Sequence, residues 1–282
     1  MSHALTDRQW LWFAAECYLV VFLIGTVALL RGRQHSTALT YGLMAVGYLC
    51  QFVGLYLRGT AVGGCPLGNN FEIVQFTAWS ATTLYLLIGV TFRSSAFGYF
   101  TACLTAVLSF LSLAMPAWDA TRRTGIFGGN PWIEFHAALA LFSYGVFALL
   151  ALTSLMFLLR NYSLKKKHVS GWFSFLPSIM DLDHIGVRLL SAGVFLMTAS
   201  LAVGAVWWAR DIAAVNTTKL LVTVAIWAAY GLTLTFRLRG RLFAGRFAWT
   251  CVVLFAAALL SIGPVNASRH TPAPAATLRL QP

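Results

Sequence analysis

The sequence is poor in charged residues, and poorest in acidic ones. Aspartate and glutamate number only 8 in 282 residues, and all charged residues together make up 10% of the chain, whereas a typical soluble domain has about 25%. So few charges cannot cover a surface that faces water, which excludes a soluble globular protein and a disordered one. Hydrophobic residues make up 59% of the chain and the mean hydropathy is +0.75, so the composition indicates a membrane protein.

The sequence also lacks the short motifs of several common enzyme classes. No P-loop, GxSxG, HExxH or GxGxxG pattern occurs, so nucleotide, hydrolase and zinc chemistry have no support. Neither CxxC nor CxxCH occurs, and four of the five cysteines fall within apolar segments, where a thiol packs as a small hydrophobe. Only Cys65 lies in a connection, so no disulfide partner is evident. We expect no thiol-redox role and no independent catalytic activity.

Long apolar stretches predict eight membrane-spanning helices, because a helix needs about 20 apolar residues to cross the bilayer. The segments are residues 10–30, 38–57, 72–92, 97–116, 133–159, 187–209, 218–236 and 247–264. None of the connections is long enough to hold a soluble domain. We therefore predict an all-α fold, a polytopic transmembrane helix bundle formed by residues 1–264 with its core at about 58–270, and a polar tail at 265–282.

The basic residues predict the orientation of this bundle. The 20 Lys and Arg residues divide into 12 on one set of connections, including the run at 165–167, and 8 on the other. Basic residues concentrate on cytoplasmic connections, so both termini are expected outside. The net charge of +12 is then explained by orientation and not by nucleic-acid binding. The first span is too long for a cleaved signal peptide, and basic residues follow it instead of preceding it.

Two histidines stand at the predicted outer surface. His136 lies near the outer end of the fifth span in WIEFHAALALFSYG (132–145), and His270 follows the eighth span in SIGPVNASRH (261–270). Two neutral imidazoles on one side of a membrane can serve as the axial ligands of a haem iron, or as two ligands of another metal. The alternative is an interfacial ring that is hydrogen-bonded to a neighbour.

Basic and aromatic residues on the same side favour haem. Haem propionates are carboxylates, which arginine can bind through two hydrogen bonds, and tryptophans can supply flat apolar walls or form an aromatic belt. The candidate haem contacts are Arg122, Arg123, Arg269, Lys219, Trp207 and Trp208.

Other polar residues near span ends have structural interpretations. Glu72 is expected in the first turn of the third span, with Asn69 or Asn70 as the helix cap. His184 lies beside Asp181 and Asp183, where structural hydrogen bonding is expected.

Taken in order, the motifs resemble those of the cytochrome c assembly protein family, which includes the CcsA, CcmC and HemX types of haem-handling membrane protein. They are GCPLGNNFE (64–72), WIEFHAALALFSYG (132–145), LPSIMDLDHIGVRL (176–189) and GAVWW (204–208). The resemblance implies that two outward histidines ligate haem, and His136 and His270 match their positions. It also implies a transient b-type haem, an apocytochrome c or a second membrane assembly subunit as partner, and the cell inner membrane.

Two departures from the family pattern open an alternative. The family's cytochrome c synthetases carry a tryptophan-rich Trp-Asp-Pro segment between the sixth and seventh spans, where this chain has ARDIAAVNTTK (209–219) and retains only Lys219. They also carry a histidine within the next span, where this chain has Thr235. The sequence thus predicts either an assembly protein that binds or delivers haem, or a HemX-like regulatory or scaffold protein. A transporter of another class is disfavoured because the spans lack midplane charges and internal repeats.

Overall fold

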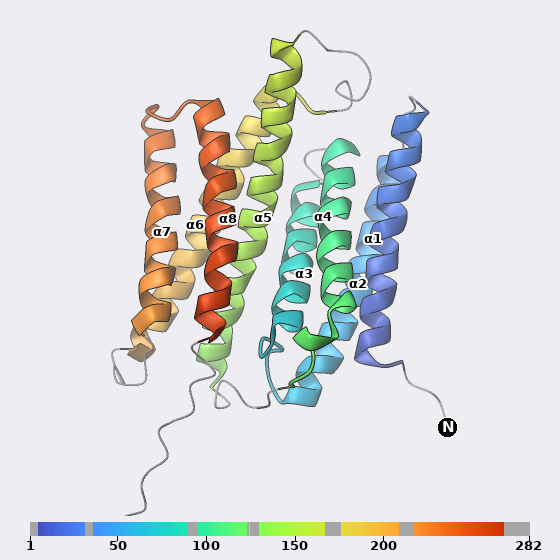
Figure 1. Ribbon diagram of the computed structural model, residues 1–282, viewed down its shortest axis with the longest axis vertical. Coiled ribbons are helices and arrows are strands. Elements are labelled where there is room, and N and C mark those ends of the chain that lie inside the picture. Colours follow the sequence, from blue (N-terminus) through green and yellow to red (C-terminus); the bar gives the residue numbers. More distant parts are fainter. Residues whose placement is uncertain are drawn as a thin grey trace, which may run out of the picture.

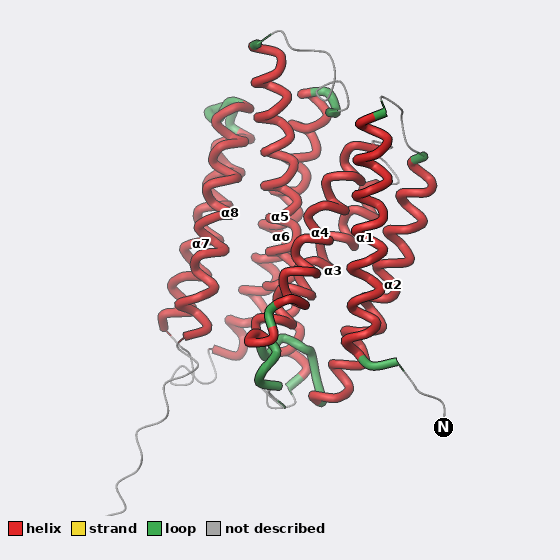
Figure 2. Tube along the Cα trace, turned by 45° about the vertical axis from the view of Figure 1, so that its right-hand side comes forward, coloured by secondary structure: helices red, strands yellow, loops and turns green. Residues whose placement is uncertain are grey.

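The computed structural model describes residues 5–31, 36–89, 95–122, 124, 130–166, 176–208 and 217–267. Over these ranges the chain is helical, with short connections and no strand (Figure 2). The helices are α1 (Asp7–Leu30), α2 (Thr37–Val62), α3 (Asn70–Gly89), α4 (Ser95–Ala114), the 3-10 turn η1 (Pro116–Trp118), α5 (Pro131–Lys165), α6 (Ile179–Trp208), α7 (Thr217–Leu238) and α8 (Ala244–Ala267). This confirms the predicted all-α bundle.

The α-helices run up and down, so the bundle has two distinct ends (Figure 1). The odd-numbered helices begin, and the even-numbered helices finish, at the end that we call the amino-terminal end; the other is the opposite end. Helices α1 to α4 form one half and α5 to α8 the other, and α3 packs against α5 to join the halves (Figure 1). The start of α5 and the end of α8 therefore lie at the same end.

Within the described residues, seven helices are long and apolar enough to cross a membrane, namely α1, α2, α4, α5, α6, α7 and α8. Helix α3 carries polar side chains that are buried in the bundle, namely Gln75, Ser80 and Thr82. It begins as predicted, since the Asn69 side chain accepts a hydrogen bond of 2.9 Å from the backbone N–H of Glu72. The preceding helix, α2, ends at Gly63, whose φ of +71° is a left-handed conformation that glycine adopts without strain.

A chain of buried polar side chains links the first four helices. The Tyr18 hydroxyl donates to Gln51 over 2.9 Å, the Gln51 amide donates to Gln75 over 2.8 Å, and the Gln75 amide donates to the Ser112 hydroxyl over 2.8 Å. In a membrane, the hydrophobic effect does not drive helices together, because lipid tails are as apolar as the side chains. Hydrogen bonds between helices therefore help to hold a transmembrane bundle together. This series of hydrogen bonds therefore holds α1 to α4 together as one half of the bundle, and α3 of that half packs against α5.

At the opposite end, Arg237 of α7 joins three helices. It forms an ion pair with Asp183 of α6, donates to the Leu242 carbonyl over 2.9 Å, and lies 5.2 Å from the ring centre of Phe247 on α8. The Ser178 hydroxyl donates to Asp181 over 2.6 Å. Asp181 and Asp183 thus make the structural bonds expected of this segment, whereas His184 is exposed.

Candidate functional site

Four of the predicted site residues lie on α5, α6 and α7 near the helix ends at the amino-terminal end of the second half of the bundle. His136 lies in the second turn of α5, Trp207 and Trp208 end α6, and Lys219 lies in the first turn of α7. Helix α8 finishes at the same end, just before the tail that carries Arg269 and His270. Arg123, Arg269 and His270 lie outside the described residues, as do the side chains of Trp207 and Lys219.

The His136 ring is half-buried and held against α6. Its Nδ1 lies 2.7 Å from the Ser200 carbonyl oxygen and 3.1 Å from the Ser200 hydroxyl. A carbonyl oxygen can only accept a hydrogen bond, so Nδ1 must carry the proton. In the neutral ring Nε2 then presents a lone pair, and it has no hydrogen-bond partner among the described residues. This is the state in which histidine binds a metal.

Two residues that follow Ser200 on α6 shape the space around the ring. A Cβ placed on Gly204 would lie 2.8 Å from Cε1 and 2.9 Å from Nδ1 of His136. The Trp208 ring packs edge-on against the imidazole, with ring centres 5.8 Å apart and an interplanar angle of 80°. Within the GAVWW segment, Gly204 thus leaves space for the imidazole and Trp208 packs beside it. The two residues lie on the same face of α6 because they are four positions apart.

Helix α5 is also anchored on its other side. The Glu134 carboxylate, two residues before His136, accepts a hydrogen bond of 3.3 Å from the backbone N–H of Cys65 in the α2–α3 connection. The Asn130 side chain caps the helix by accepting from the Trp132 N–H over 3.0 Å, and Pro131 stands at the first helical position, where its missing N–H does no harm. The turn that carries His136 is therefore fixed by both halves of the bundle.

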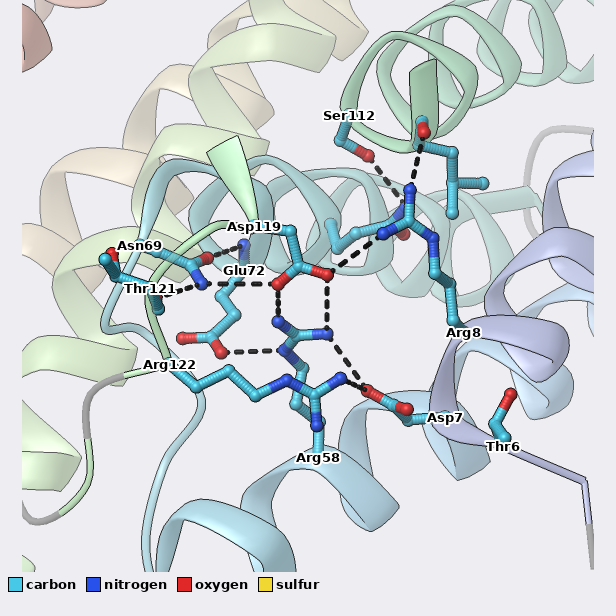
Figure 3. A network of polar contacts seen from close by, with 12 residues as sticks. Thr6, Asp7, Arg8, Arg58, Asn69, Glu72, Ser112, Asp119, Thr121 and Arg122 are labelled. Atoms are coloured by element: carbon cyan, nitrogen blue, oxygen red, sulfur yellow. Dashed lines mark hydrogen bonds and ion pairs between the residues drawn. The ribbon is translucent and has the colours of Figure 1, made fainter. Parts of the chain in front are cut away.

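A cluster of six charged residues fills the same end of the first half (Figure 3). Arg58 of α2 is fully buried and pairs with Glu72 at 2.7 Å, with Asp7 at 3.0 Å, and with Asp119. Arg8 and Arg122 complete the cluster through Asp119 and Asp7, at 3.2 and 2.9 Å. We call these residues the Arg58 cluster; its three arginines and three carboxylates balance in charge.

One predicted site residue belongs to the Arg58 cluster. Arg122 was expected among the haem contacts, but its guanidinium pairs with Asp7 at the start of α1. The structure brings His136 and Trp208 into contact, and the helix ends that carry Trp207 and Lys219 lie at the same end of the bundle. Arg122 lies beside Asp7 (Figure 3).

An apolar cavity of about 410 Å³ lies between α2 and α3 at the amino-terminal end. Phe52, Tyr56, Phe76 and Trp79 supply most of its aromatic wall, and Gly64 and Pro66 close one side. None of the predicted site residues that the structure describes lines it. The cavity is thus separate from the contact between His136 and Trp208.

Comparison with known proteins decides the family. A family model described as "Cytochrome C assembly protein" matches residues 67–266. The chain belongs to the cytochrome c assembly protein family. It is 26% identical to Protein HemX of Brevibacillus brevis over 75% of this chain and 78% of that protein, and 25% identical to Protein HemX of Bacillus subtilis over 67% and 69%. It is 28% identical to the cytochrome c biogenesis protein CcsA of Chlamydomonas reinhardtii, over 66% of this chain and 52% of that one.

Within this cytochrome c assembly protein, sequence reasoning missed the residues that hold the site in place. Ser200 is one of many helical serines, and nothing in its sequence neighbourhood marks it as a partner of His136, which lies 64 positions away. Asp7 and Asp119 were not singled out, and Arg58 was only one of the 8 basic residues counted on the outer connections. The one available signal was chemical: an arginine in an apolar segment needs an acidic partner.

The environment of Cys65 leads to a prediction about its reactivity. Burial, and then the negative charges of Glu134 and Glu72, together raise the pKa of the Cys65 thiol to about 11. The thiolate is the reactive form, so iodoacetamide should alkylate Cys65 at pH 8 about 100-fold more slowly than an ordinary thiol. In a variant that keeps only this cysteine, the rate should rise about tenfold per pH unit toward pH 11, and Glu134→Gln should accelerate it. A plateau near the ordinary thiol pKa of about 8.5 would contradict this prediction.

Proposed function

We propose that this cytochrome c assembly protein binds haem at the amino-terminal end of its bundle, with His136 Nε2 as one axial ligand and His270 as the other. The observation that carries the proposal is the hydrogen bond from Nδ1 to the Ser200 carbonyl at 2.7 Å. That bond leaves Nε2 as the ligand atom and makes it a stronger donor to iron. The two histidines therefore fit a haem iron, because this iron is a Lewis acid that two imidazoles can ligate.

In this proposal the haem is cargo. Trp207 and Trp208 stand beside its apolar faces, and Arg269, Arg123 and Lys219 pair with its propionates. Arg122 can join them only if it shares its charge with Asp7, from which its guanidinium lies 2.9 Å. The haem is a transient b-type haem, because no cysteine pair is available to attach it. An apocytochrome c or a second membrane subunit receives it.

The orientation and the membrane are part of the same proposal. Several basic residues at the opposite end, among them Lys165, Lys166, Arg239 and Arg241, are exposed. Exposed Lys and Arg favour the cytoplasmic side. The amino-terminal end with His136 then faces outward from the inner membrane of the cell, on the side where c-type cytochromes would receive haem.

One observation supports a second candidate, a HemX-like regulatory or scaffold protein. Thr235, which stands where the resemblance places a histidine within the membrane, is exposed on α7. Its hydroxyl donates to the Gly231 carbonyl of its own helix over 2.8 Å. Position 235 therefore faces away from the bundle interior and provides no ligand for haem on its way across the membrane. The second candidate keeps the fold without haem delivery.

A haem titration separates the two candidates. The full chain, purified in detergent, is titrated with haem and followed by visible absorption, together with the variants His136→Ala and His270→Ala. We expect a six-coordinate low-spin spectrum for the wild type and a loss of affinity greater than about 100-fold in each variant, because removing a ligand costs more than removing its hydrogen-bond partner. His184→Ala, an exposed histidine at the opposite end, is the matched control and should bind as the wild type does.

Two results would count against haem binding by these residues. If the wild type takes up no haem, the regulatory or scaffold candidate is favoured. If His136→Ala and His184→Ala bind haem equally well, then the haem site lies elsewhere in the protein.

A further inference from the structure

The inference concerns two residues of α6, Ser200 and Gly204, and it rests on the proposed function of His136. Most serine and threonine hydroxyls in the described helices donate a hydrogen bond to a carbonyl of their own helix. On α6 itself, Thr198 donates to the Val194 carbonyl over 2.7 Å, and on α7 Thr233 donates to the Ala229 carbonyl over 2.7 Å. Serine and threonine side chains in helices commonly form such local hydrogen bonds.

Ser200 departs from that pattern. Its hydroxyl donates across to α5, to the backbone carbonyl of His136, over 2.9 Å. With its hydrogen committed there, its oxygen faces Nδ1 of the same histidine at 3.1 Å and can only accept. The Ser200 carbonyl accepts from Nδ1 as well, at 2.7 Å, and the serine is 1% exposed. One buried residue thus bonds both the backbone and the ring of His136.

Gly204 makes these bonds possible. It lies one helical turn after Ser200, so its Cα faces the same side of α6. A Cβ at this position would stand 2.9 Å from Nδ1 and 2.8 Å from Cε1, closer than van der Waals contact allows, and would push the ring off the Ser200 carbonyl. Trp208, a further turn along, holds the ring from the edge.

We infer that Ser200 and Gly204 are the positioning residues of the haem ligand: they hold the His136 ring with its proton on Nδ1, so that Nε2 is the only atom it presents to the haem iron. A ring held in this way cannot turn to offer Nδ1, and it reaches the ligand geometry before haem arrives. Such outer partners fix the tautomer and the direction of a ligand, and their loss typically weakens metal binding about 10- to 100-fold.

The first test reads the tautomer without haem. The haem-free protein is labelled with ¹⁵N-histidine, and the ring nitrogens of His136 are assigned as the signals that His136→Ala loses. At a pH where the ring is neutral, we expect the proton on Nδ1 in the wild type, and a shift of the proton toward Nε2 in Gly204→Ala, because the ring loses its carbonyl acceptor. Gly231→Ala, a helical glycine with nothing within 4 Å of a built Cβ, should leave the signals unchanged. A wild-type ring with its proton on Nε2 overturns the inference.

The second test measures haem affinity with matched variants. Ser200→Ala removes the hydroxyl but keeps the carbonyl, and we expect about a tenfold loss of affinity; Gly204→Ala should lose about 100-fold. Ser143→Ala is the control for the first, since Ser143 is buried on α5 and its hydroxyl bonds only its own helix, at the Ala140 carbonyl. If His136→Ala loses haem but Ser200→Ala and Gly204→Ala keep wild-type affinity, the inference fails while the proposed function stands. If the proton is on Nδ1 but no variant or wild type binds haem, the proposed function fails and the positioning of the ring stands.

Discussion

Replacing Arg58 with methionine is expected to lower the free energy of unfolding by about 3–5 kcal/mol, the largest effect that we predict for this protein. Arg58 is fully buried, and it is the only residue that contacts all three carboxylates of the Arg58 cluster among the described ion pairs. Methionine has a similar volume and fills the space, so the loss comes from charge. Glu72 is 1% exposed and would lose its nearest counter-ion.

The geometry shows why neighbouring arginines cannot replace Arg58. Arg8 and Arg122 lie at the margin of the cluster, where their side chains are 36% and 44% exposed. Each pairs with a single carboxylate, Asp119 or Asp7, and neither has an ion pair with Glu72 in the described part of the chain. The Glu72 carboxylate would retain only the N–H of Gly68, at 2.6 Å. A buried carboxylate with one neutral donor is poorly compensated.

Unfolding in detergent micelles, followed by helical circular dichroism, measures the effect. Arg239→Met is the matched control, because Arg239 is exposed at the opposite end, and it should change the free energy of unfolding by less than about 0.5 kcal/mol. Adding Glu72→Gln to Arg58→Met should recover part of the loss, since one unpaired carboxylate is then removed. Equal stability of Arg58→Met and Arg239→Met would show that the cluster does not stabilise the fold.

The second large effect is expected at the contact between the two halves of the bundle. Gly145 of α5 packs directly on Ser80 of α3: a Cβ at position 145 would overlap the Ser80 hydroxyl and lie 2.8 Å from the Ser80 Cβ and 3.0 Å from the backbone nitrogen of Ala81. Small residues permit such close approach of helices in membranes. We expect Gly145→Val to destabilise the protein by about 3 kcal/mol or more, because a backbone atom cannot move aside as a flexible side chain can.

The same unfolding measurement tests this contact. Gly42→Val is the control, since nothing lies within 4 Å of a Cβ built on Gly42 of α2. The milder change Gly145→Ala should be partly rescued by Ser80→Gly, which removes the hydroxyl and the Cβ that the new methyl group meets. Finding that Gly145→Val is as stable as Gly42→Val would mean that the halves are not closely packed at this point.

Much of the fold could be predicted from periodicity and length alone. The apolar runs placed the helices, because a membrane requires about 20 apolar residues per crossing, and alternation then placed His136 and the end of α8 at the same end of the bundle. Asn69 or Asn70 was expected as the cap of α3, and the structure shows Asn69 in that role; capping depends on residues three positions apart. Helix α3 was predicted as a span like the others; the structure adds that it contacts α2, α4 and α5, which hydropathy does not report.

The sequence by itself determined the membrane class, the helical fold, the resemblance to the cytochrome c assembly family and the choice of His136, because each depends on local composition or on motifs read in order. Only the tertiary structure decided what His136 and Arg58 contact. Ser200 lies 64 positions from His136, and Asp119 lies 61 positions from Arg58. Hydrogen bonds and ion pairs act over a few ångströms, so their partners are set by how α5 meets α6 and how the α4–α5 connection folds back on α2. A charge count therefore identified Arg58 as one basic residue on the outer connections, and the packed bundle shows it to be the centre of a neutral cluster.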